Sequence, residues 1–203
     1  QEKFERGTDT QICGPFDGAF GFLFILEIAS IIGNDSLADP NVGVDIILFD
    51  GEDYGQPENS DLPYQDNTWC LGSQYWSRNK HKANYRANYG ILLDMVGAKG
   101  AKFAREGNSR QFAPDVVEKV WRTANRLGYS DYFIFMDSPP ITDDHAYVNA
   151  WGGVRMIDII EYDPIGTDFF SDYHHTHRDN MDIIDRKTLK AVGQTVLHVV
   201  YQE

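Results

Sequence analysis

Short apolar runs of strand length alternate with helical segments along this chain, and that alternation restricts its fold more than any other feature. Strands are predicted at residues 44–49 (VDIILF), 89–95 (YGILLDM), 132–136 (YFIFM) and 154–160 (VRMIDII), with a candidate edge strand at 102–105. Nearly continuous apolar runs are typical of strands buried on both faces, as in a parallel sheet covered by helices. We therefore expect an α/β fold with a mostly parallel central sheet flanked by helices.

Helices are predicted between these strands by apolar periodicity and by signals at their ends. Residues 17–32 predict a helix that is apolar nearly all round and therefore buried, with a Gly-Asn pair as its stop. Pro114 opens a second helix, whose apolar stripe ends before Gly128. Asp185 is the expected cap of a last helix. No internal repeat or linker divides the chain, so we expect residues 1–203 to form a single domain.

Composition excludes several classes of function. Lys plus Arg number 18 and Asp plus Glu 31, which gives a formal net charge of −13. Nucleic acids and anionic membranes attract basic surfaces, so neither is expected as the main partner. The longest apolar run, residues 19–26, is far shorter than the ~20 residues of a membrane span. Cys13 and Cys70 form no metal or redox motif, and one bridge or two free thiols are equally compatible with them.

Acidic residues follow the predicted strands. In an open α/β sheet, ligands bind beyond the carboxyl ends of the strands. Crowded carboxylates repel one another and raise their pKa values, and a bound cation removes that cost. Aspartate and glutamate oxygens together with a histidine nitrogen suit zinc. The groups at these ends are Asp50 to Asp53, Asp94, Asp143 to His145, and the histidine-rich loop 173–179, with Asp17 at the start of the first helix.

Each acidic group also has a structural interpretation. Asp17 alone is typical of a helix cap. Glu52 and Asp53 alone are compatible with a solvated turn. The alternating histidines of the loop 173–179 are compatible with a strand on the surface. The coincidence of all these groups at predicted strand ends favours a metal site.

Short segments of the chain also resemble the zinc-dependent aminopeptidase and glutaminyl cyclase superfamily. The matches occur in the family's order from about residue 14 onward, so the set is more specific than any one match. Residues 14–19 and 26–29 (GPFDGA, LEIA) resemble the family segment "GAxDGAsG…LLEiAr", and residues 48–53 (LFDGED) resemble "FFDgEE/ED". Residues 92–97 (LLDMVG) resemble "LLDmvG", residues 142–145 (TDDH) resemble "xDDH", and residues 175–179 (HTHRD) resemble the closing "HTxxD".

The resemblance implies a zinc site. Asp17, Asp53 and His175 are the ligands it implies, because they occupy the ligand positions of the matching motifs. His175 is the match within its cluster because it directly precedes a threonine. His174 and His177 are expected to support the site or to lie on the surface.

The resemblance also implies which carboxylates carry the chemistry. Glu52 is the implied general acid/base, since it adjoins a ligand and can reach whatever binds the metal. Asp94 and Asp143 are expected beside it as a hydrogen-bonding pair in a cyclase. In a peptidase, Asp94 is instead the ligand of a second zinc ion.

One departure from the family bears on the activity. The peptidases carry a His-x-Asp motif on a strand well before the "GAxD" segment, and this chain begins too late to contain it. We therefore expect an N-terminally incomplete catalytic domain that lacks the first strands. The missing histidine binds metal in two-zinc peptidases but not in single-zinc cyclases, so its absence favours a cyclase.

The resemblance leads to a ranked set of functions. The first is a glutaminyl-peptide cyclotransferase that converts N-terminal glutamine to pyroglutamate with one zinc ion. The alternatives are an aminopeptidase, with two zinc ions, and a non-catalytic relative of the same fold. Peptide or protein N-termini are the expected partners, and a periplasmic or secreted location is implied by the family alone. No oligomeric state is predicted.

Overall fold

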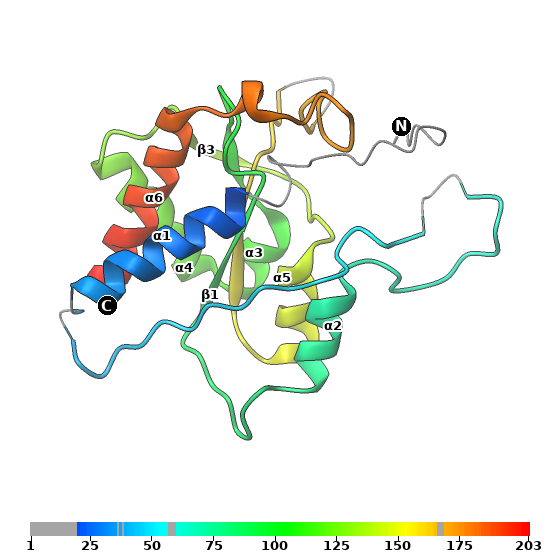
Figure 1. Cartoon of the computed structure of the whole chain (residues 1–203), viewed down its shortest axis with the longest axis horizontal. Helices are drawn as coiled ribbons and strands as arrows, with labels where there is room; N and C mark the ends of the chain where they lie inside the picture. Colours follow the sequence, from blue (N-terminus) through cyan, green and yellow to red (C-terminus); the bar gives the residue numbers. More distant parts are fainter. Residues whose placement is uncertain (1–19, 36, 38, 57–59, 166–168) are drawn as a thin grey trace.

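The structure is a computed structural model of the chain, and it describes residues 20–35, 37, 39–56, 60–165 and 169–203. Parallel strands in open sheets lie between helices, so the predicted α/β class is confirmed (Figure 1). No helix in the described ranges is both long and apolar enough to cross a membrane.

Most predicted elements form within a few residues of their expected ends. The described helices are α1 (Phe20–Asn34), α2 (Leu71–Arg78), α3 (Gly107–Phe112), α4 (Pro114–Arg126), α5 (Asp144–Tyr147) and α6 (Arg186–Tyr201), with a π-helix at Val148–Gly152 and a 3₁₀ helix at Met181–Ile183. The strands are β1 (Gly90–Asp94), β2 (Phe103–Arg105), β3 (Phe133–Asp137) and β4 (Met156–Ile160).

The strands form two parallel pairs. β1 pairs with β4 in a register that sets Asp94 opposite Ile160. β2 pairs with β3, with a register shift between Phe103 and Arg105. An antiparallel bridge from Phe103 to Glu161 links the pairs, so β2 lies inside the molecule and is not the exposed edge we expected.

The prediction of a buried strand at residues 44–49 is wrong for the described structure. The segment forms no strand, and Val44, Ile46 and Leu48 are 41%, 40% and 55% exposed. A cavity of about 470 Å³ lies between this segment and β1. Because a strand requires a hydrogen-bonded neighbour, a segment on the far side of a cavity does not become one.

Helix α1 is buried on one side only. It packs on α6 so closely that a Cβ on Gly193 would lie 2.7 Å from the ring of Phe24. Ile28 is buried, whereas Phe22 and Leu26 are 43% and 48% exposed. The expectation of complete burial is therefore wrong, because among the described elements only one face of α1 is covered. The start predicted for this helix at Asp17 lies outside the described residues.

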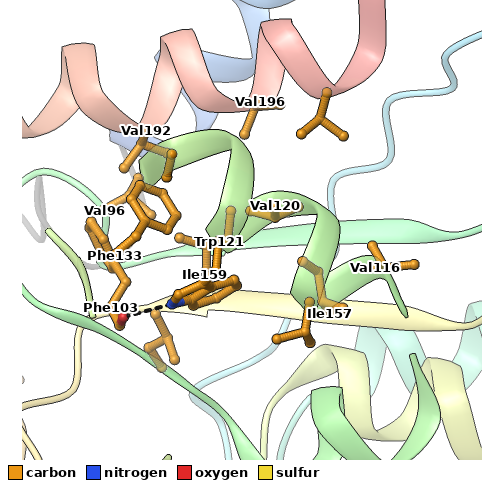
Figure 2. Close-up of a cluster of buried hydrophobic side chains, with 14 of the residues drawn as sticks. Val96, Phe103, Val116, Val120, Trp121, Phe133, Ile157, Ile159, Val192 and Val196 are labelled. Atoms are coloured by element: carbon orange, nitrogen blue, oxygen red, sulfur yellow. Dashed lines mark hydrogen bonds between the residues drawn. The ribbon is translucent and has the colours of Figure 1, made fainter. Parts of the chain in front are cut away.

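The main hydrophobic core joins α4 and α6 to the strands (Figure 2). Ile157 and Ile159 of β4 face this core, and the intervening Asp158 points to the opposite face because side chains alternate along a strand. Trp121 is fully buried at the centre, where its indole N–H donates to the carbonyls of Phe103 and Ile134, both at 3.1 Å.

Replacing Trp121 with Phe is expected to lower the free energy of unfolding by roughly 1–3 kcal/mol, because the buried carbonyl of Phe103 and the half-buried carbonyl of Ile134 lose their donor. Denaturant unfolding monitored by circular dichroism measures the change. The control Trp151→Phe alters a tryptophan that is 39% exposed and should change stability by about 0.5 kcal/mol or less. Equal effects of the two substitutions would contradict the central place of Trp121.

Candidate metal and catalytic site

The first turn of α2 holds the acidic segment that follows residues 44–49. The first N–H groups of a helix have no partners within the helix. Here the N–H of Leu71 donates to the carbonyl of Gly51 at 3.0 Å, and the N–H of Gly72 to that of Asp50 at 2.8 Å. The N–H of Cys70 donates to the carbonyl of Glu52 at 2.9 Å. These bonds place Glu52 and the residue after it.

Gly72 permits this close approach. A Cβ at this position would lie closer than 3.0 Å to the backbone of Asp50. We expect Gly72→Ala to displace the acidic segment and to lower both metal affinity and turnover by at least about 10-fold, because small displacements of catalytic groups are costly. Metal titration and steady-state kinetics measure the effect.

Gly43→Ala is the matched control, because no atom lies within 4 Å of a Cβ placed there. It should leave metal affinity and turnover unchanged. Wild-type behaviour of Gly72→Ala would mean that the helix contact does not place the acidic segment.

The Glu52 carboxyl is largely buried beside a buried thiol. Its Oε1 accepts from the Cys70 Sγ at 3.5 Å. Burial, followed by the hydrogen bond and charge of Asp53 and the charge of Asp143, raises the pKa of Glu52 to about 10. Cys70 is a free thiol, and burial together with the nearby carboxylates raises its pKa far above the usual value. Cys13 lies outside the described residues.

Asp53 and His175 meet although they are far apart in the sequence. The His175 Nε2 lies 3.1 Å from the Asp53 Oδ1. Burial opposes the charge on Asp53, but hydrogen bonds from His175 and Glu52 lower its pKa to about 2. His175 adopts a left-handed backbone conformation, with φ of 54°, and such conformations gather at functional sites.

The separation of the Asp53 and His175 side chains fits two ligands of one zinc ion. Two ligands bound at about 2.0–2.1 Å in tetrahedral geometry lie roughly 3.3 Å apart, close to the observed separation. A carboxylate oxygen with an imidazole nitrogen is also a donor set that zinc accepts. The third expected ligand, Asp17, lies outside the described residues.

The neighbouring histidines differ from His175. His174 stacks on His175 with ring centroids 3.9 Å apart. Burial, followed by the charge of His175, lowers the pKa of His174 to about 4. His177 is exposed. Within this loop, His175 is therefore the residue that contacts Asp53.

Asp143 also lies in the acidic cluster. It is the N-cap of α5, where its carboxyl accepts from the N–H of Asp144. Glu52, Cys70 and Asp143 each offer a ligand atom within 4.8 Å of the other two. Burial raises the pKa of Asp143.

Asp94 lies one step further along the cluster. It ends β1, and its charge acts on Asp158 of the neighbouring strand β4. Of the predicted carboxylates, the structure thus brings Asp143 to Glu52 and Asp94 to Asp158.

Three buried residues adjoin the cluster: Glu106, His145 and Asp158. The sequence interpretation gives Glu106 and Asp158 no role, and it includes His145 only as part of the acidic segment 143–145 without a role of its own. Asp143, His145 and Asp158 form a second group whose ligand atoms lie within 4.8 Å of one another. The one feature of the sequence that could have drawn attention to such residues is a polar residue within an apolar run, such as Asp158 in the strand MIDII. An aspartate in a buried strand requires a partner, and periodicity does not identify it.

The chain matches peptidase family M28 over residues 5–200 and belongs to that family. A zinc-dependent exopeptidase from Parabacteroides distasonis is 50% identical, with a TM-score of 0.88 over 94% of this chain and 64% of its own. A Bacteroides thetaiotaomicron glutaminyl cyclase bound to N-acetylhistamine is 48% identical, with a TM-score of 0.91 over 98% of this chain and 66% of its own.

A leucine aminopeptidase precursor from Bacteroides thetaiotaomicron is similar to the same extent, with 47% identity and a TM-score of 0.89 over 98% of this chain and 66% of its own. No curated protein matches the chain. The chain spans about 64% of the length of the first of these relatives. Zinc exopeptidases and glutaminyl cyclases thus share this fold at nearly equal similarity.

Proposed function

We propose that this protein is a zinc-dependent glutaminyl-peptide cyclotransferase, with residues 1–203 acting as one catalytic domain. The observation that carries the proposal is the buried Glu52 carboxyl beside the Asp53–His175 pair. Similarity to solved glutaminyl cyclases supports it. Its substrates are N-terminal glutaminyl residues of peptides or proteins, and we propose a periplasmic or secreted location by analogy with the family.

Asp17, Asp53 and His175 are the proposed ligands of one zinc ion. Asp53 and His175 have the separation that such a pair requires. When bound, zinc polarises the γ-carbonyl of the substrate glutamine.

Glu52 is the proposed general acid/base. A carboxyl with a pKa raised to about 10 holds a proton near neutral pH in the metal-free site, and a bound cation lowers that pKa. In the reaction, Glu52 accepts a proton from the substrate α-amine as the amine attacks the γ-carbonyl. It then donates that proton to the nitrogen that leaves as ammonia. Asp143 and Asp94 maintain the hydrogen-bonding group behind it.

The alternative is a zinc aminopeptidase, which the similarity to a leucine aminopeptidase precursor favours. In that reaction Glu52 is the base for a water molecule that attacks the first peptide bond. Asp94 then serves as the ligand of a second zinc ion.

Product analysis tests the proposal. Incubation with a peptide that begins with glutamine should release ammonia and leave a blocked N-terminus, and elemental analysis should find one zinc ion per chain. Release of a free N-terminal amino acid with two zinc ions would establish the aminopeptidase. Neither product, together with no uptake of zinc on titration, would identify a non-catalytic relative.

A further inference from the structure

Glu106 is a fully buried carboxylate surrounded by donors. It follows β2 and is the N-cap of α3. Its Oε1 accepts from the backbone N–H groups of Asn108 at 2.7 Å and Ile141 at 2.8 Å. Its Oε2 accepts from the N–H of Ser109 at 2.6 Å and from the hydroxyl of Ser109 at 2.7 Å. A group with so many donors is an ionised acceptor, and its pKa is lowered to about 2 although burial opposes the charge.

His145 completes this set of contacts. Its Nε2 lies 2.9 Å from the Glu106 Oε2, and both side chains are fully buried. Because Glu106 can only accept, the proton of this hydrogen bond belongs to Nε2 of His145. The other ring nitrogen, Nδ1, faces the Asp158 Oδ2 at 3.6 Å. Glu106 thus orients the imidazole toward Asp158.

The backbone of Asp158 is held by the same glutamate. The N–H of Asp158 donates to the Ser109 Oγ at 2.9 Å, and that hydroxyl donates to Glu106. A closed ring of contacts therefore runs from Glu106 through His145 to the Asp158 side chain and back through Ser109, with hydrogen bonds on every side except the 3.6 Å approach of His145 Nδ1 to Asp158 Oδ2. Asp158 is placed on this face because Ile157 and Ile159 face the core.

Asp158 and Asp143 form a pair of neighbouring carboxyl groups whose ligand atoms lie within 4.8 Å of each other. Burial, followed by the charge of Asp143, raises the pKa of Asp158. Both side chains are buried, and within the described residues no hydrogen-bond donor reaches either oxygen of Asp158. Two adjacent carboxyl groups in a buried site cannot both be ionised at low cost, so they share a proton. Asp143 is also the member of the pair that lies beside Glu52.

We propose that Glu106, His145 and Asp158 are positioning residues that hold the Asp143 carboxyl in the orientation Glu52 requires for proton transfer. Glu106 fixes the imidazole, the imidazole fixes Asp158, and Asp158 fixes Asp143 through the shared proton. None of the three contacts the substrate. The inference rests on the proposed acid/base function of Glu52.

Substitutions at Asp158 test the proposal by kinetics. The amide that Asp158→Asn introduces still donates to Asp143, so this variant should lower kcat by less than about 10-fold and shift the pH profile of kcat. Asp158→Leu removes the partner and should lower kcat by at least about 100-fold, the scale of losing acid/base catalysis. KM and zinc content should stay within about twofold of wild type.

Thr195→Val is the control. It alters a buried hydroxyl in α6 that donates to the carbonyl of Ala191, away from the site. It should leave kcat and its pH profile unchanged even if stability falls. Equal kcat values for Asp158→Asn and Asp158→Leu would overturn the proposal. Loss of a metal ion from Asp158→Leu would overturn it in favour of a cation held by Asp143, His145 and Asp158.

A measurement on the resting protein separates this proposal from the proposed function. With ¹⁵N-labelled histidine, the spectrum should contain the signal of one ring that carries its proton on Nε2, because this nitrogen lies 2.9 Å from the Glu106 Oε2. His145→Gln should remove that signal while its amide still donates to Glu106. A bare Nε2 on His145 would overturn the network whatever reaction the protein catalyses. A wild-type protein that shows the expected tautomer but releases no ammonia would contradict the proposed function alone.

Discussion

Replacing Glu52 with Gln is expected to lower turnover of an N-terminal glutaminyl peptide by roughly 100-fold or more, the usual scale for losing a general acid/base. Glutamine keeps the size of the side chain and its hydrogen-bonding capacity. It cannot carry a proton from the α-amine to the leaving nitrogen. Zinc content should remain at the wild-type value, because the proposed ligand is the adjacent Asp53. Ammonia release and elemental analysis of the same preparation measure both effects.

Glu118→Gln is the matched control for this substitution. Glu118 lies on the surface of α4 and pairs with Arg122 one helical turn away. Surface ion pairs of this kind contribute little to stability, so the variant should fold as the wild type does and its turnover should change by less than about twofold. Unchanged turnover in Glu52→Gln would remove Glu52 from the mechanism. Loss of zinc in that variant would instead make Glu52 a ligand.

Replacing His175 with Ala is expected to remove the bound metal and, with it, the activity. The imidazole lies 3.1 Å from the Asp53 Oδ1, and no other histidine in the described residues forms an ion pair with Asp53. The loss of zinc affinity should exceed the roughly 10–100-fold that removal of a residue hydrogen-bonded to a ligand costs. Zinc titration against a competing chelator gives the affinity, and ammonia release gives the activity.

His177→Ala serves as the control because His177 belongs to the same loop and is exposed. It should bind zinc as the wild type does. If His177→Ala lost the metal and His175→Ala retained it, the ligand assignment within this loop would be wrong. Loss of metal from both variants would point to a general disturbance of the loop.

Elements defined by neighbouring residues were predictable from the sequence. Helix α4 begins at Pro114 and buries its apolar stripe as the periodicity indicates, since spacing along one helix determines which side chains share a face. Likewise, β1 and β4 form where apolar runs occur, and acidic residues follow them. The motifs also identified Glu52, Asp53, Asp143 and His175, which the structure brings into one cluster.

Tertiary structure decided what depends on partners distant in the chain. Residues 44–49 have the composition of a buried strand, but whether a run becomes a strand depends on a neighbour that can pair with it, and here a cavity intervenes. For the same reason α1 is covered on one face only. The ring of Glu106, His145 and Asp158 joins three separate elements, and the sequence contains each residue without indicating that they meet. Hydrogen bonding between buried groups depends on folding geometry, so the positions of these side chains were determined only when the strands and helices packed together.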